Sequence, residues 1–375
     1  MHRTASRALA LALTVLASTA CGARTDVAPF DASRTPTVDA GTDAGTDAGE
    51  CVAACGARRC GPDPVCGRSC GSCGSGETCT SLGACAVLQW SPVASPTTAW
   101  LNEVWGSAAD DVWVVGGNAL EAGSIALLHY DGRAWSSVLP PTRSALYGVW
   151  GFARDDVWAV GGGGVILHFD GRAWAPVTSP EVSLLVSVWG AGPRDVWAGG
   201  RDGALAHYDG LRWTDVRVSG SLIDGRASLW GSGPSDVWSA GGPTGGSDSA
   251  LVHVDGASWS TRERRAGGLS GVWGTSASNA WMVGDSSVVL HFDGRAWTPF
   301  AAPAGPALYD VWGAAADDVW ASGWATMLHF DGRAWSTVPV PATEGLFGVW
   351  GSAADDVWAV GKSGAILHFG PVVGL

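Results

Sequence analysis

Histidine recurs at one place in a repeated pattern along this chain, and its side chain is well suited to bind a metal or carry a proton near neutral pH. The repeated residues are His129, His168, His207, His253, His291, His329 and His368. A metal ion needs its ligands within a few ångström of each other, whereas equivalent positions in successive repeats are spread apart. We therefore expect structural hydrogen bonds from these histidines and predict no metal site.

An acid or amide also recurs, two residues before a tryptophan in each repeat. The set is Asp111, Asp156, Asp195, Asp236, Asn279, Asp318 and Asp356. A catalytic carboxylate would not need to appear in every copy, so we expect these side-chain oxygens to accept backbone N–H groups in a tight turn. The chain has no nucleophile elbow, phosphate-binding loop, HExxH motif or paired acids. The sequence predicts no catalytic residues and no cofactor.

The elements that must position these side chains are short strands. The motif V-W-G, with Leu for Val in one copy, recurs with a period of 38 to 45 residues, which indicates an array. Its tryptophans are Trp105, Trp150, Trp189, Trp230, Trp273, Trp312 and Trp350, and a second tryptophan follows each of them eight residues later. Four strand-like runs fill each unit, and Asp-Gly pairs such as Asp170-Gly171 join the last two as hairpins. Four antiparallel strands per unit are typical of a β-propeller blade.

The two ends of the array complete each other. The seventh unit stops at Leu375 without a fourth strand, while the run Gln89–Val93 ahead of the first unit matches Ala334–Val338. Pairing of that run with the last unit would leave the ring without an open edge. The predicted fold class is therefore all-β: a seven-bladed β-propeller over residues 87–375, closed by its N-terminal strand.

One face of the predicted disc is more variable than the other. The turns after the second strands and the crossovers between blades differ in length, and such differences confined to one face often mark a binding face. The candidate ligand-binding residues there are Trp100, Trp324, Arg201, Asp202, Lys362, Arg262, Arg264 and Arg265. We expect Trp100 and the arginines near position 264 in crossovers, and the others in turns. Two alternatives stay open: these loops merely tolerate change, or the two tryptophans cap the core.

The N-terminus has the features of an export signal. Residues 1–20 combine Arg3 and Arg7 with an apolar run too short to span a bilayer. Cys21 follows and resembles the lipobox cysteine of bacterial lipoproteins, although Ser18 stands where that family prefers Leu. Lipidation of Cys21 at the outer membrane or cell surface and release by ordinary signal peptidase both stay open. Residues 21–50 hold almost no large apolar side chain and are expected to form a disordered tether.

Nine cysteines occur, and eight of them crowd into residues 51–86, which we expect to form a small knob. They are Cys51, Cys55, Cys60, Cys66, Cys70, Cys73, Cys79 and Cys85. In an exported chain this density predicts disulfides, whose pairing the sequence leaves open. Cys70 and Cys73 have zinc-ligand spacing, but neither a second such pair nor paired histidines accompany them. The remaining cysteine, Cys21, is the one that lipidation would use.

The repeat unit can also be compared with known families. The unit L-x-x-V-W-G-x-x-x-x-D-V-W-A-V-G…I-L-H-F-D-G-R-A-W resembles tectonin-type and related bacterial β-propeller repeats over about residues 87 to 370. It is less similar to WD40 repeats, because their Gly-His and Trp-Asp pairs are absent. Tectonin-type relatives include lectins that bind bacterial surface glycans, so the resemblance implies a binding protein of this kind.

Function is predicted from this resemblance together with charge. The net charge of −13 argues against a nucleic-acid partner. We expect an exported, non-catalytic binding protein whose ligand is a surface glycan and which meets a membrane only through an N-terminal lipid. The alternatives are a scaffold for protein assembly at the outer membrane or cell surface and, third, an enzyme that uses the propeller face.

Overall fold

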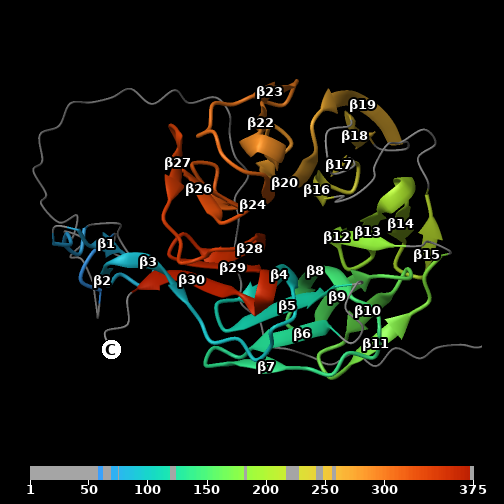
Figure 1. Ribbon diagram of the computed structural model, residues 1–375, viewed down its shortest axis with the longest axis horizontal. Coiled ribbons are helices and arrows are strands. Elements are labelled where there is room, and N and C mark those ends of the chain that lie inside the picture. The colour runs from blue at the N-terminus through green and yellow to red at the C-terminus, as the bar shows by residue number, and fades with distance from the viewer. Residues whose placement is uncertain are drawn as a thin grey trace, which may run out of the picture. The chain divides into compact units, whose positions relative to one another are not determined.

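Most of the described part of the chain forms a ring of seven sheets. The computed structural model describes residues 58–61, 69–74, 76–118, 124–180, 184–216, 228–241, 248–255 and 259–371. Seven four-stranded antiparallel sheets stand side by side around a centre, and the innermost strand of each touches that of the next (Figure 1). The predicted seven-bladed β-propeller is confirmed. The predicted signal peptide and tether, with Cys21, lie outside the described residues.

Each blade uses its four strands in the same order. The innermost strands carry the V-W-G motif: β4 (Leu101–Ala108), β8 (Leu146–Ala153), β12 (Leu185–Gly192), β16 (Ser228–Gly233), β20 (Leu269–Ser276), β24 (Leu308–Ala315) and β28 (Leu346–Ala353). The second strands carry the second tryptophan: β5 (Asp111–Gly117), β9 (Asp156–Gly161), β13 (Asp195–Gly200), β17 (Asp236–Gly241), β21 (Asn279–Gly284), β25 (Asp318–Gly323) and β29 (Asp356–Gly361).

The outer half of each blade is a hairpin. The third strands carry the histidine: β6 (Ile125–Tyr130), β10 (Ile166–Phe169), β14 (Leu205–Tyr208), β18 (Asp248–Asp255), β22 (Val289–Phe292), β26 (Thr326–Phe330) and β30 (Ile366–Pro371). The fourth strands are β7 (Trp135–Ser137), β11 (Trp174–Val177), β15 (Trp213–Asp215), β19 (Trp259–Ala266), β23 (Trp297–Pro299), β27 (Trp335–Val338) and β3 (Leu88–Pro92). Three single 3-10 turns, η1 (Arg201–Gly203), η2 (Asp285–Ser287) and η3 (Lys362–Gly364), follow second strands. None of the described helices is long and apolar enough to cross a membrane.

Tryptophan packing between blades forms the core. The second-strand tryptophan of one blade meets the fourth-strand tryptophan of the next edge to face, as Trp113 meets Trp174 with ring centroids 5.2 Å apart and planes at 82°. The same contact joins Trp358 of blade seven to Trp135 of blade one. Such T-shaped pairs add about 0.5–1.5 kcal/mol to the gain from burial. The buried tryptophans therefore hold neighbouring blades together at six of the seven junctions, those whose side chains the structure describes.

In six blades the glycine of V-W-G is required by close contact with a tryptophan of the preceding blade, and in blade three by contact with Phe152. A side chain at Gly231 would put its Cβ 2.7 Å from Cη2 of Trp189, and a Cβ at Gly351 would lie 2.6 Å from Cη2 of Trp312. These distances lie well inside ordinary van der Waals contact of about 3.5–4.0 Å. The glycine in the motif is thus explained by the close approach of each innermost strand to the preceding blade.

The ring closes as expected. Strand β3 pairs antiparallel with β30, with Leu88 opposite Pro371 and Trp90 opposite Phe369. The indole of Trp90 is buried against Trp320 of blade six. The first strand of the propeller therefore supplies the fourth strand of blade seven, which confirms the predicted closure.

A small disulfide-bonded knob precedes β3. Strands β1 (Thr78–Cys79) and β2 (Cys85–Ala86) form its hairpin, and two disulfides join Cys60 to Cys79 and Cys73 to Cys85. Cys70 is disulfide-bonded as well, while Cys51, Cys55 and Cys66 lie outside the described residues. The predicted disulfides are thus confirmed for the described cysteines.

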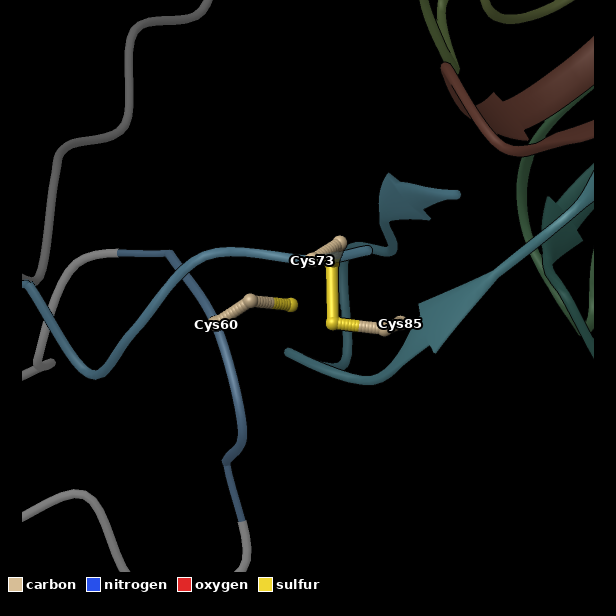
Figure 2. Close-up of side chains that lie close together, drawn as sticks. All are labelled: Cys60, Cys73 and Cys85. Carbon is tan, nitrogen blue, oxygen red and sulfur yellow. A yellow bond between two sulfur atoms is a disulfide. The ribbon is translucent and has the colours of Figure 1, made fainter. Parts of the chain in front are cut away.

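The sulfur atoms of the knob are crowded but are not metal ligands. Those of Cys60, Cys73 and Cys85 lie within 4.8 Å of one another (Figure 2). Each belongs to a disulfide, and the thiolate form that a metal would need is not available from a disulfide. The cluster is therefore structural.

Candidate functional site

The repeated histidines hold each blade together. In blade two, Nε2 of His168 lies 2.7 Å from Oδ1 of Asp156, and the imidazole ring packs against the Trp158 indole with ring centroids 4.3 Å apart and planes at 35°. The same bond joins histidine to aspartate in five of the other blades, at 2.6–2.7 Å. The structural role predicted for the histidines is confirmed.

The expectation for the acid itself is wrong. We expected it to accept backbone N–H groups, but its oxygens bond the histidine and, in several blades, a serine such as Ser107. Blade five shows why Asn serves equally well there: Oδ1 of Asn279 accepts from Nε2 of His291 at 2.7 Å, while its Nδ2 donates to Thr275. An oxygen acceptor is sufficient at this position, and a charge is not required.

The aspartate of the Asp-Gly turns makes the backbone bonds instead. Oδ1 of Asp131 accepts from the N–H groups of Arg133 and Ala134 at 2.9 and 3.0 Å. These hydrogen bonds lower the pKa of the Asp131 carboxyl, since they favour its charged form. Gly132 takes a φ of 84°, which favours glycine over other residues. The backbone hydrogen bonds predicted for the acid before the second tryptophan are thus made by the aspartate of the Asp-Gly turn.

Three candidate residues from different blades meet at the face formed by the second turns and the crossovers. Trp100 precedes β4 of blade one, Trp324 lies in the second turn of blade six, and Lys362 begins η3 in blade seven. The Lys362 ammonium lies 6.0 Å from the centroid of the Trp100 ring and 5.7 Å from that of Trp324. Both distances permit cation–π attraction. The structure therefore brings these predicted residues together.

Glu344 and Phe347 complete this group, which we name the tryptophan cluster: Trp100, Trp324, Glu344, Phe347 and Lys362. Oε1 of Glu344 accepts from the Lys362 ammonium at 2.9 Å, and its Oε2 accepts from the Ser363 hydroxyl at 2.6 Å. Phe347 is buried, with its ring 5.6 Å from that of Trp100. Hydrogen bonds from Ser363 and Lys362 lower the pKa of the Glu344 carboxyl. The cluster thus combines aromatic faces with a fixed ion pair.

Backbone hydrogen bonds tie together the segments that carry Trp324, Glu344 and Lys362. The crossover from blade six to blade seven lies between two turns: the Ala325 N–H donates to the Glu344 carbonyl at 3.0 Å, and the Lys362 N–H donates to the Gly345 carbonyl at 2.9 Å. Ala325 and Ser363 adopt left-handed conformations, with φ of 49° and 58°. Strain of this kind tends to collect at functional sites. The indole of Trp324 nevertheless stays 44% exposed and is available to a ligand.

The other candidate residues lie away from this cluster. Arg201 and Asp202 are in η1 of blade three, where the Arg201 side chain is exposed. Among the contacts of the described residues, none joins Arg201 to the cluster. Arg201, in blade three, is therefore not part of the cluster that the described contacts define.

The crossover predicted for Arg262, Arg264 and Arg265 is wrong. These residues lie in strand β19, where Arg264 pairs with Ala250 and Arg265 with Ser249. The hairpin of blade four is extended because buried Ser249 donates to the Gly267 carbonyl at 2.5 Å and accepts from the Leu269 N–H at 2.9 Å. These bonds tie the far end of the hairpin to the start of blade five. The run of charged residues therefore belongs to an edge strand.

Sequence reasoning missed Glu344 and Phe347. Glu344 occurs in one crossover only, so no repeat drew attention to it, although a search for a partner of Lys362 could have found it. Phe347 occupies a position of the innermost strand where Tyr147 and Tyr309 stand in other blades. The recurrence of an aromatic residue at this position could have indicated Phe347 as a site residue.

Comparison with known proteins supports the fold. No family model and no curated protein matches the chain. Among solved structures, YCF48 bound to a D1 peptide is similar with a TM-score of 0.60 and 18% identity, over 75% of this chain and 96% of that chain. YCF48 from Cyanidioschyzon merolae is similar with a TM-score of 0.57 and 18% identity, over 75% of this chain and 98% of that chain. The WD40 β-propeller domain of Doa1 is similar with a TM-score of 0.59 and 11% identity, over 75% of this chain and 97% of that chain. The chain thus has the fold of a WD40-like, seven-bladed β-propeller, and its tectonin-type resemblance remains a prediction from sequence.

Proposed function

We propose that this chain is an exported, non-catalytic binding protein that holds a surface glycan at the tryptophan cluster. The observation that carries the proposal is the exposed indole of Trp324 beside the ion pair of Lys362 and Glu344. The apolar face of a sugar ring can lie on an indole, while an adjacent carboxylate and hydroxyl bond sugar hydroxyl groups. Each of these groups stands within one small area of the variable face.

A peptide is the second candidate ligand. One of the similar propellers was solved with a peptide bound, and propellers of this fold therefore include peptide binders. A peptide could place an aliphatic side chain on Trp324 in the same way as a sugar ring. Under this alternative the chain would be a scaffold for protein assembly at the cell surface.

The first experiment separates the two ligands. Purified full-length protein is applied to a glycan array, and to cell-envelope fractions treated either with periodate, which cleaves sugar diols, or with protease. Glycan binding predicts signals on the array and loss of envelope binding after periodate. Loss after protease alone, with no array signal, would contradict the proposal in favour of the scaffold.

The second experiment locates the site. Trp324→Ala and Trp100→Ala, alone and together, should weaken binding by up to about tenfold each, the size expected for losing one aromatic contact. The melting temperature should barely change for Trp324→Ala because its indole is exposed. Leu211→Ala is the control, since Leu211 is 89% exposed in the Asp-Gly turn of blade three, at the opposite face. Unaltered affinity would move the site elsewhere, and a large fall in melting temperature would make the tryptophans core residues.

Export and anchoring have their own test. The proposal assigns a lipid to Cys21 because eight further cysteines form an even set for disulfides. Cys21→Ser should move the protein from the membrane fraction to the soluble fraction. Wild-type protein already found in the soluble fraction would refute lipidation and leave free secretion.

A further inference from the structure

We infer that the ion pair of Glu344 and Lys362 makes the tryptophan cluster selective for neutral sugars over acidic ones. This inference rests on the proposed glycan-binding function and narrows its ligand class. A lysine at a sugar site would ordinarily favour an acidic ligand, because its ammonium attracts a carboxylate. In the tryptophan cluster the Lys362 ammonium is already paired with the Glu344 carboxylate.

The contacts of Lys362 show how its charge is balanced. Its ammonium donates to the Glu344 carboxylate at 2.9 Å and lies between two indole rings, whose faces are electron-rich. Lys362 is the one cation of the cluster and Glu344 the one anion, so their charges cancel. The chain as a whole carries −13, which disfavours the approach of an anion further.

Two further hydrogen bonds hold Glu344 in position. Its second oxygen accepts from the Ser363 hydroxyl at 2.6 Å, and its backbone carbonyl accepts from the Ala325 N–H. The Glu344 carboxyl is charged at neutral pH, since even the ordinary glutamate pKa lies well below 7 and its own is lower still. A sugar carboxylate on Trp324 would therefore lie near the Glu344 carboxylate with no unpaired cation in the cluster to bind it, whereas a neutral hydroxyl would find an acceptor.

The test compares matched sugars and matched variants. Oligosaccharides of galactose and of galacturonic acid, which differ by a carboxylate for a hydroxymethyl group, are applied to wild-type full-length protein, Glu344→Gln and Asp317→Asn. Asp317 is exposed at the opposite face, so Asp317→Asn makes the same change in net charge away from the site. Wild type should prefer the neutral member of such pairs. Glu344→Gln should shift the ratio toward the acidic member by about fivefold or more, the effect of one unit charge at about 4 Å in water.

The outcomes distinguish a failure of the selectivity for neutral sugars from a failure of glycan binding itself. Wild-type preference for acidic sugars, or equal shifts in Glu344→Gln and Asp317→Asn, would overturn the selectivity while leaving glycan binding intact. Absence of binding to any glycan would overturn the proposed function and the selectivity with it.

The knob contacts blade seven at the place where a turn lies in other blades. In five blades the glycine of the Asp-Gly turn rests on the first turn of the same blade: a Cβ on Gly132 would lie 2.7 Å from Cβ of Asp110, and one on Gly332 2.8 Å from Cβ of Asp317. Blade seven has no such turn, because its third and fourth strands, β30 and β3, come from opposite ends of the chain. The corresponding acid there is Asp355.

The hairpin of the knob occupies this place. Oδ2 of Asp355 accepts from the backbone N–H of Ser81 at 2.7 Å and from its hydroxyl at 3.2 Å. Asp355 is buried, whereas Asp110 and Asp155 in the same position are exposed. The disulfides of Cys79 and Cys85 fix the two strands that carry this hairpin. We propose that the knob is a clip that replaces the missing turn and holds β3 in blade seven.

Hydrogen exchange tests the clip in the full-length protein. Asp355→Ala should speed exchange of the β3 amides by about tenfold or more, the effect of losing hydrogen bonds to a charged group. Asp317→Ala, the equivalent change in blade six, should leave those amides unaffected. The Cys73→Ala, Cys85→Ala double variant should behave like Asp355→Ala. Equal exchange of β3 in Asp355→Ala and Asp317→Ala would overturn the proposal.

Discussion

Replacing Gly231 by alanine tests whether the V-W-G motif exists for the contact between blades. The added Cβ would lie 2.7 Å from Cη2 of Trp189 and 2.5 Å from the Asp236 carbonyl oxygen. Trp189 is buried and cannot swing away. The strand must therefore shift by about 1 Å to restore ordinary contact. Overpacking of this kind costs about 1–3 kcal/mol.

Gly233, in the same strand β16, supplies the control. A Cβ there meets nothing within 4 Å, and neither glycine has a left-handed backbone. Both substitutions stabilise by restricting the unfolded chain, by about 0.4–1 kcal/mol, and this gain cancels when the two variants are compared. Their difference should therefore equal the overpacking cost.

The assay is thermal unfolding of both variants at one scan rate. At roughly 2–4 °C for each kcal/mol, Gly231→Ala should melt several degrees below Gly233→Ala. The same loss is expected for Gly351→Ala, where the contact is with Trp312. Equal melting temperatures for Gly231→Ala and Gly233→Ala would refute the packing explanation of the motif.

Three further predictions concern closure and titration. A chain that starts at Thr97 lacks β3 and should melt lower and aggregate more than one starting at Val87, because the edge of β30 is left open; equal stability would contradict the pairing. Burial lowers the pKa of His291, so the folded chain binds fewer protons there than the unfolded one, and stability should fall as pH drops below about 6.5. Asn279→Asp should raise that pKa, seen by NMR titration, and flatten the pH dependence; an unchanged pKa would contradict this account. Burial alone would raise the pKa of Asp111, but hydrogen bonds from His129 and Ser107 outweigh it and lower the pKa, so its stabilising effect is lost below about pH 4. Asp111→Asn should fold normally and lose less stability in acid than wild type does, as measured by melting at pH 3 and pH 7.

The fold was predictable because its main contacts recur. Trp90 could be matched to the fourth-strand tryptophans from sequence, and its pairing with Phe369 follows from that match. The Asp-Gly turns fixed the hairpins, so the two faces of the disc could be assigned before any contact was known. Trp100, Trp324 and Lys362 were placed on the same face in this way, and they meet there.

Features that occur once were not predictable. Glu344 and Ser81 act through contacts with residues distant in sequence or in a different segment, and no periodicity reports such pairs. The role of the repeated acid was misassigned because Asp156 stands beside a tight turn, where backbone N–H groups are common partners of aspartate. Only the three-dimensional register shows that it faces His168 on the neighbouring strand instead. The extension of blade four escaped notice because the residues of β19 are polar and show no strand alternation.

The pairing of β3 with β30 has a consequence for the order of folding. Strand β3 leaves the ribosome before the other strands of the ring, yet its partner β30 is the last of them to be made, so blade seven cannot form until every strand of the ring exists. Blades one to six can each fold from contiguous sequence, whereas the final step brings together segments of very large sequence separation and is expected to be slow. A permuted chain whose ends were moved to the turn between Gly161 and Ile166 would make blade seven contiguous and shift the late step to blade two. Folding rate, rather than final stability, is the property that the site of closure should control.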